Sequence, residues 1–138
     1  MILNIYTDGG ALNNPGPAAA SFLIYKDKKL LLQGNKFLGK NTNNFAEYSA
    51  VVLAYEGLKK TLLGNREVKK IVFHSDSALL VNQLNGLFKI KNAVIREFVL
   101  KIKGLENEIN LPIVYKYIPR ENNEEADALV KKILTPAA

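Results

Sequence analysis

Residues 2–38, ILNIYTDGGALNNPGPAAASFLIYKDKKLLLQGNKFL, predict three β-strands in direct succession at the start of the chain. Residues 2–7 are rich in β-branched and aromatic side chains, and the first strand is expected to end at Asp8, before the chain-breaking pair Gly9-Gly10. Residues 18–26 and 29–38 form the next two strands, which are joined as a hairpin through Asp27-Lys28.

The rest of the chain alternates helices with strands. A helix is expected from the capping residues Thr42-Asn43-Asn44 to about Leu63, where Gly64-Asn65 closes it, and a strand follows over 70–74. A short helix should then run from Ser75-Asp76-Ser77 to Gly86. The remaining elements are an amphipathic helix, a strand over 112–118 and a helix over 123–134; the apolar stripe of the amphipathic helix consists of Ile95, Phe98, Ile102, Leu105 and Ile109. The order βββαβααβα predicts an α/β fold, in which helices cover a mixed sheet, within a single domain over residues 1–138.

Composition excludes several classes of protein. The 138 residues are enough for one domain around one core, and 48% hydrophobic with 23% charged residues argues against a disordered chain or a coiled coil. Cysteine is absent, which excludes disulfides, cysteine-ligated zinc and thiol nucleophiles. The first residues do not resemble a signal peptide, and no apolar run has membrane-spanning length. We expect a cytoplasmic monomer with no membrane association and no obligate protein partner.

The net charge favours a polyanionic partner. Nineteen lysines and arginines against 13 acidic residues give +6 and a pI near 9.5. Two windows, 28–46 and 77–96, contain no acidic residue. Their basic residues are Lys28, Lys29, Lys36, Lys40, Lys89, Lys91 and Arg96.

Two carboxylates occupy the apolar faces of predicted helices. Glu47 shares the helical stripe of Val51, Ala54 and Leu58, at i+4, i+7 and i+11. Asp127 precedes Val130 and Leu134 by three and seven residues. Both carboxylates are therefore expected to point towards the sheet. Burying an ionised group there is costly unless a charged or hydrogen-bonding partner compensates it.

Two further carboxylates lie at predicted strand ends, Asp8 after the first strand and Asp76 after the fourth. Sites in open α/β sheets gather at the carboxyl ends of strands, so all four groups are expected to converge. Four anions in a small volume would repel one another unless divalent cations were bound among them. Carboxylate oxygens without cysteine favour Mg2+ or Mn2+ over zinc or copper.

Each of these residues also has a purely structural interpretation. Asp8 could form a turn before Gly9-Gly10, Asp76 could be a helix N-cap, and Asp127 could be one surface acid among several. His74 lies two residues before Asp76, on the same strand face, but a lone strand histidine is more often packed than a ligand.

Four segments, in order, resemble the motifs of type 1 ribonuclease H. They are TDGG (7–10) with NPGP (14–17), TNNFAEY (42–48), SDS (75–77) and RENNEEAD (120–127). The match spans nearly the whole chain. The resemblance implies a five-stranded mixed sheet whose first three strands are antiparallel, with helices on both faces, and the expected order of elements agrees.

The resemblance also implies a function. Asp8, Glu47, Asp76 and Asp127 correspond to the metal-binding catalytic quartet of an endonuclease that cuts the RNA strand of RNA/DNA hybrids. Two Mg2+ or Mn2+ ions held by such carboxylates can activate a water for in-line attack and stabilise the leaving 3'-oxygen, which gives 5'-phosphate and 3'-hydroxyl products. The residues that correspond to contacts with the nucleic acid are Asn14, Thr42, Asn43 and Asn44, which could equally serve as caps and turn formers.

The chain departs from many relatives in two places. No inserted basic protrusion fits between Gly86 and Arg96, so Lys89 and Lys91 are expected to take over phosphate contacts, unless they are only solvated surface lysines. The loop before Asp127 lacks the relatives' histidine. Arg120 resembles the arginine of the branch without that histidine, and we expect it to contact phosphate or stabilise the transition state, with an ion pair to Glu121 or Glu124 as the structural alternative.

Two other functional classes compete with the hybrid-specific nuclease. One is a non-catalytic module that binds hybrids or duplex RNA, for which the loss of a carboxylate would be typical, and none is lost. The other is a polynucleotidyl transferase or resolvase on the same scaffold, with DNA as its substrate. The segments 14–16 and 42–44 favour ribonuclease H over both.

Overall fold

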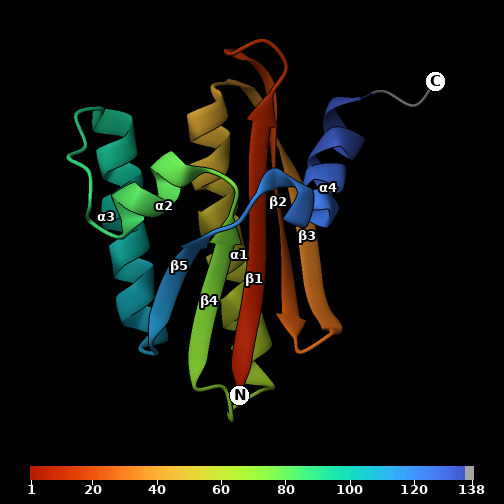
Figure 1. The fold of residues 1–138 in the computed structure, drawn as a ribbon, viewed down its shortest axis with the longest axis vertical. Coiled ribbons are helices and arrows are strands. Elements are labelled where there is room, and N and C mark those ends of the chain that lie inside the picture. The colour runs from red at the N-terminus through yellow and green to blue at the C-terminus, as the bar shows by residue number, and fades with distance from the viewer. Residues whose placement is uncertain (136–138) are drawn as a thin grey trace.

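The computed structural model describes residues 1–135 and contains a five-stranded sheet with helices on both faces (Figure 1). The elements are β1 (Ile2–Ala11), β2 (Gly16–Lys26), β3 (Lys29–Asn41), α1 (Asn43–Leu63), β4 (Lys70–Ser75), α2 (Ala78–Leu84), α3 (Ala93–Ile109), β5 (Ile113–Tyr117), the 3-10 turn η1 (Arg120–Asn122) and α4 (Glu124–Leu134). The predicted order of elements and the α/β class are confirmed.

The sheet has the strand order β3-β2-β1-β4-β5. β1 to β3 form an antiparallel meander, whereas β4 and β5 run parallel to β1, so the sheet is mixed. Helix α1 packs along β1, β2 and β3 on one face, and α4 covers the same strands on the other (Figure 1). The carboxyl ends of β1 and β4 therefore meet at one edge, between the starts of α1 and α4.

The first strand is longer than predicted, because it continues through Gly9-Gly10 to Ala11. The pair does not break the chain, since Gly9 pairs with Ala20 and Gly10 with Ala19 in the antiparallel register with β2. A Cβ on Gly9 would lie 2.3 to 2.5 Å from backbone atoms of α1. The glycine is therefore required for the close approach of α1 to β1, and not for a turn.

The core lies mainly between the sheet and α1. Its largest fully buried side chains include Tyr48, Tyr55 and Phe73, and the predicted stripe of α3 contributes Ile102 and Leu105. The caps are also as predicted: the Thr42 hydroxyl accepts a hydrogen bond from the Phe45 amide, and Gly64 follows the last turn of α1. Within residues 1–135, none of the helices combines the length and apolar character that crossing a membrane requires.

Candidate active site

All four predicted carboxylates line a single open cavity of about 400 Å3 at the carboxyl ends of β1 and β4. Arg120 and Asn43 line the same cavity. The side chains come from four different elements or their ends, so only the tertiary fold brings them together. The predicted convergence of Asp8, Glu47, Asp76 and Asp127 is therefore observed.

The strand register places the two aspartates of the sheet. Tyr6 pairs with His74 in the parallel ladder between β1 and β4, and Asp8 and Asp76 each follow two residues later. Asp8 lies inside a continuous strand, opposite Ser21 of β2, which excludes its interpretation as a turn former. The cap of α2 is Ser77, whose hydroxyl accepts from the Leu80 amide, so Asp76 is not the N-cap.

Glu47 is placed by the contact between α1 and β1. The Cβ that Gly9 lacks would lie 2.5 Å from the Glu47 backbone nitrogen. The first turn and a half of α1 thus rests directly on the strand that carries Asp8. Val51, Ala54 and Leu58, which share the glutamate's face, are buried, as the helical spacing predicts.

Asp127 is held by α4, whose first turn is tied to the sheet by a hydrogen bond of 2.6 Å from the Ser21 hydroxyl to the Ala126 carbonyl. Lys131, one turn later, forms an ion pair of 2.8 Å with the Asp127 carboxylate. Lys131 was not predicted as a site residue, although its i,i+4 spacing from Asp127 is a recognisable signal.

Arg120 lies at the start of η1 and reaches towards the carboxylates. Its Nε is 4.0 Å from an Asp76 carboxylate oxygen, and its side chain is 89% exposed. The predicted alternative, an ion pair with Glu121 or Glu124, is not among the contacts of the described residues.

Burial and mutual repulsion raise the pKa values of Asp8, Glu47 and Asp76. Burial, followed by the charges of Asp76, Asp127 and Glu47, raises the pKa of Asp8 to about 8. Burial raises the pKa of Glu47 to about 7, opposed by the Ser77 hydroxyl and the Arg120 guanidinium. The pKa of Asp76 is also raised by burial, although the neighbouring Arg120 opposes this. The negative charges of these carboxylates are thus not fully compensated by the neighbouring cationic side chains.

The donor chemistry fits Mg2+ or Mn2+. Every acidic group in the cavity offers carboxylate oxygen, the ligand that these hard cations prefer. A cation among the groups would relieve the repulsion that, together with burial, raises the pKa of Asp8. Within residues 1–135, no three His, Asp or Glu side chains stand close enough to form a finished ligand set. The four carboxylates would therefore have to move closer together to coordinate a cation.

Three of the predicted nucleic-acid contacts form a rim beside the cavity: Asn14, Thr42 and Asn43, of which Asn43 also lines the cavity. The Asn14 side-chain oxygen accepts from the Asn43 amide at 2.9 Å, and the Asn43 side-chain oxygen accepts from the Ala11 amide at 2.7 Å. Thr42 caps α1. The capping and turn-forming roles that the sequence offered for these residues are thus observed. In both asparagines the side-chain oxygen serves as the acceptor, so the Nδ2 group is left to donate to a ligand.

Five of the predicted nucleic-acid contacts do not line the cavity: Asn14 and Thr42 of the rim, and also Asn44, Lys89 and Lys91. Asn44 is exposed on the first turn of α1, and Lys89 and Lys91 are exposed in the connection between α2 and α3. His74 also lies outside the cavity, because its ring stacks on Tyr6 with centroids 4.6 Å apart and its Nε2 pairs with the Asn4 side chain at 2.9 Å.

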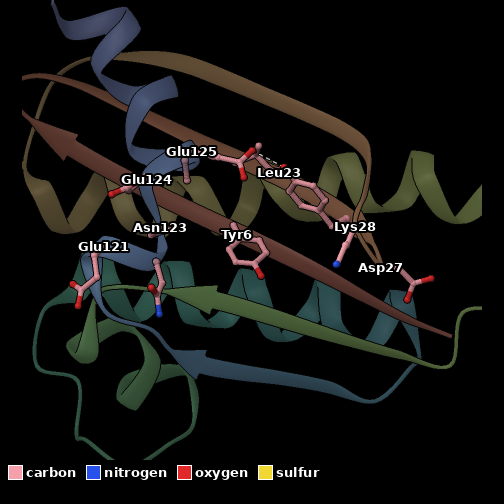
Figure 2. Close-up of a pocket in the computed structure, with 11 residues that line it drawn as sticks. Tyr6, Leu23, Asp27, Lys28, Glu121, Asn123, Glu124 and Glu125 are labelled. Atoms are coloured by element: carbon pink, nitrogen blue, oxygen red, sulfur yellow. Dashed lines mark hydrogen bonds between the residues drawn. The ribbon is translucent and has the colours of Figure 1, made fainter.

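A larger cavity, of about 510 Å3, lies beside the start of α4 and contains none of the predicted site residues (Figure 2). Tyr6 and Tyr25 line it from the sheet, and the Tyr25 hydroxyl donates to Glu125 of α4. Cavity size therefore does not identify the candidate active site, whereas the gathering of carboxylates does.

Known proteins share this fold over almost its whole length. The Reverse transcriptase-like family model matches residues 6–133. LC11-RNase H1, isolated from compost and solved in complex with RNA/DNA hybrid, is similar with a TM-score of 0.87 and 36% identity over 94% of each chain. RNase H1 from Halobacterium salinarum has a TM-score of 0.88 and 28% identity, over 99% of this chain and 100% of that one. The chain therefore belongs to the reverse transcriptase-like family, and its resemblance to type 1 ribonuclease H is confirmed.

Some relatives are much longer than this chain. The bifunctional protein Rv2228c of Mycobacterium tuberculosis is 29% identical over 140 residues, which cover 100% of this chain and 37% of the relative. The chain thus spans well under half the length of this curated relative.

Proposed function

We propose that this protein is a ribonuclease H, an endonuclease that hydrolyses the RNA strand of RNA/DNA hybrids. The observation that carries the proposal is the convergence of Asp8, Glu47, Asp76 and Asp127 on one cavity of this fold. Support also comes from LC11-RNase H1, a ribonuclease H solved with an RNA/DNA hybrid, to which the chain is 36% identical.

The four carboxylates are proposed to hold two Mg2+ ions, with Mn2+ as a substitute. When bound between carboxylates, such ions lower the pKa of a water and stabilise the leaving 3'-oxygen, which gives 5'-phosphate and 3'-hydroxyl ends. The protein's own contribution is to mount the carboxylates on rigid elements. Asp8 and Asp76 are fixed by the β1–β4 register, and Glu47 by the contact at Gly9.

Substrate binding is assigned to the rim and to the basic residues around it. Asn14 and Asn43 would donate from Nδ2 to the nucleic-acid backbone, with Thr42 and Asn44 beside them on the same turn. Lys89 and Lys91, both exposed, would add phosphate contacts farther along the duplex. Backbone contacts carry little sequence information, so the choice of substrate would depend on 2'-hydroxyl groups and groove shape.

Arg120 is proposed to contact the phosphate near the cut. Its guanidinium remains charged at any working pH, so it cannot readily shuttle protons as a histidine does. Its side chain is 89% exposed and close to Asp76, which leaves most of its donors free for a substrate phosphate.

The proposal is tested with matched, labelled RNA/DNA, RNA/RNA and DNA/DNA duplexes, each in Mg2+, Mn2+ or chelator. The expected result is metal-dependent cutting of the RNA strand of the hybrid, with product ends that a ligase accepts directly as 5'-phosphate and 3'-hydroxyl. A hybrid that is bound but uncut under every metal would favour the non-catalytic module. Cutting of DNA/DNA alone would favour the resolvase class.

A further inference from the structure

We propose that Asn123 is a positioning residue that fixes two of the four carboxylate-bearing segments to each other: the end of β1, which carries Asp8, and the start of α4, which carries Asp127. Asn123 lies between η1 and α4, at the position just before the closing helix. This inference rests on the proposed function of the cavity, because it assigns a role towards the same carboxylates.

The Asn123 side chain is directed across the fold. It is only 2% exposed, and its Nδ2 donates to the Thr7 carbonyl at 2.9 Å. Thr7 directly precedes Asp8 on β1. The asparagine therefore fixes the loop before α4 to the strand position that carries the most perturbed carboxylate.

The same residue also contacts a second aspartate-bearing segment. Its backbone carbonyl accepts the Asp127 amide at 3.1 Å, which starts the helix that carries Asp127. One residue thus links the backbone next to Asp8 to the first turn of the helix that carries Asp127.

Local helix chemistry does not explain this orientation. An asparagine before a helix usually accepts a hydrogen bond from the first turn through Oδ1, but Asn123 makes no side-chain cap of α4. Its Oδ1 is instead buried without a hydrogen-bond partner, a costly arrangement that calls for an explanation. Holding Nδ2 against the Thr7 carbonyl is such an explanation, because a cap would direct the side chain away from β1.

The test uses Asn123→Leu and Asn123→Ala, with Asn122→Ala as the matched control. Leucine has nearly the shape of asparagine and needs no hydrogen bonds, so it removes the clamp together with the unpaired oxygen. Asn122 is exposed on the neighbouring turn and has no assigned role at the cavity. Three quantities are measured for each protein: the melting temperature, the Mg2+ dissociation constant from an NMR titration without substrate, and kcat and KM on a hybrid.

We expect both Asn123 variants to lose about 10- to 100-fold in Mg2+ affinity or kcat, the range typical of residues that orient metal ligands, with KM changed less than kcat. Asn123→Leu should show this loss even where its melting temperature is close to that of the wild type. Asn122→Ala should match the wild type in all three measurements.

Wild-type Mg2+ affinity and kcat in both variants, measured where they are folded, would overturn the assignment even if the melting temperature fell. The NMR titration separates this inference from the proposed function. If the wild type bound Mg2+ but did not cut hybrids, the function would fail, and the Mg2+ affinities would still decide the role of Asn123. If the wild type did not bind Mg2+, both proposals would fail.

Discussion

Replacing Asp8 with asparagine should stabilise the metal-free protein at neutral pH. The wild-type carboxyl has a pKa of about 8 in the folded protein, against an ordinary value of 3.8 for an exposed aspartate, which applies to the unfolded chain. Below pH 3.8 both the folded and the unfolded chain hold the proton, so the carboxyl carries no penalty. Between these two values the unfolded chain releases a proton that the folded chain retains, so stability falls as pH rises, and it becomes level above pH 8.

The size of the effect follows from this shift. At pH 7 the Asp8 carboxyl lowers the free energy of unfolding by at most about 4 kcal/mol, because each pH unit between 3.8 and 7 contributes 1.36 kcal/mol. The asparagine amide must itself be accommodated in the cavity, at about 1–3 kcal/mol if it lacks partners. The expected net gain is therefore about 1–3 kcal/mol, or a rise in melting temperature of about 3 °C per kcal/mol for a chain of this size.

The assay is thermal unfolding in chelator at pH 4, 7 and 8.5, and again at pH 7 with Mg2+. The gain of Asp8→Asn over the wild type should be near zero at pH 4 and largest at pH 8.5. Mg2+ should raise the melting temperature of the wild type by binding the folded state, but not that of the variant. Asp27→Asn, in the exposed turn between β2 and β3, is the control and should not change with pH in this way. An Asp8→Asn gain that is absent, or equal at pH 4 and 8.5, would refute the reasoning.

Three further tests by substitution address how the site is built and used. Gly9→Ala places a Cβ within 2.5 Å of the α1 backbone and should lower the free energy of unfolding, measured with denaturant, by at least about 1–3 kcal/mol. Gly10→Ala is the control and should be tolerated, because its Cβ would have neighbours no closer than 3.9 Å. Equal effects of the two substitutions would mean that the close approach of α1 to Gly9 is unimportant. The double substitution Lys89→Ala with Lys91→Ala should weaken hybrid binding. It should also reduce the slope of log affinity against log salt concentration by about one unit for each lost phosphate contact. An unchanged slope would show that these lysines do not contact the nucleic-acid backbone. Arg120→Ala should lower kcat or hybrid affinity while leaving the melting temperature within a few degrees, because the side chain is 89% exposed; unchanged kinetics would remove Arg120 from the site.

Local pattern was enough to predict much of the fold and the carboxylates. The helical spacing after Glu47 identified its buried face, and the predicted ends of the first and fourth strands placed Asp8 and Asp76 at one edge of the sheet. These features depend on periodicity and on caps such as Thr42, which are encoded within a few residues.

The remaining features depend on contacts between distant segments. Gly9-Gly10 is a chain breaker by composition, but it continues β1 because β2 supplies its partners and α1 needs the space. Asn123 was predicted only as the start of a helix, because nothing in its neighbours indicates that its amide reaches Thr7, 116 residues away in sequence. Such contacts become visible only when the strands and helices are assembled.

The central claim is that the four carboxylates carry out the chemistry, and Asp76→Asn tests it most directly. Hybrid cleavage in Mg2+ and hybrid affinity in chelator would be measured side by side for the wild type, Asp76→Asn and the control Asp27→Asn. The account predicts that Asp76→Asn loses cleavage by more than about 100-fold, beyond the loss typical of an outer-shell partner, while its affinity stays within about twofold. Cleavage by Asp76→Asn at close to the wild-type rate would contradict the assignment of this cavity as the active site.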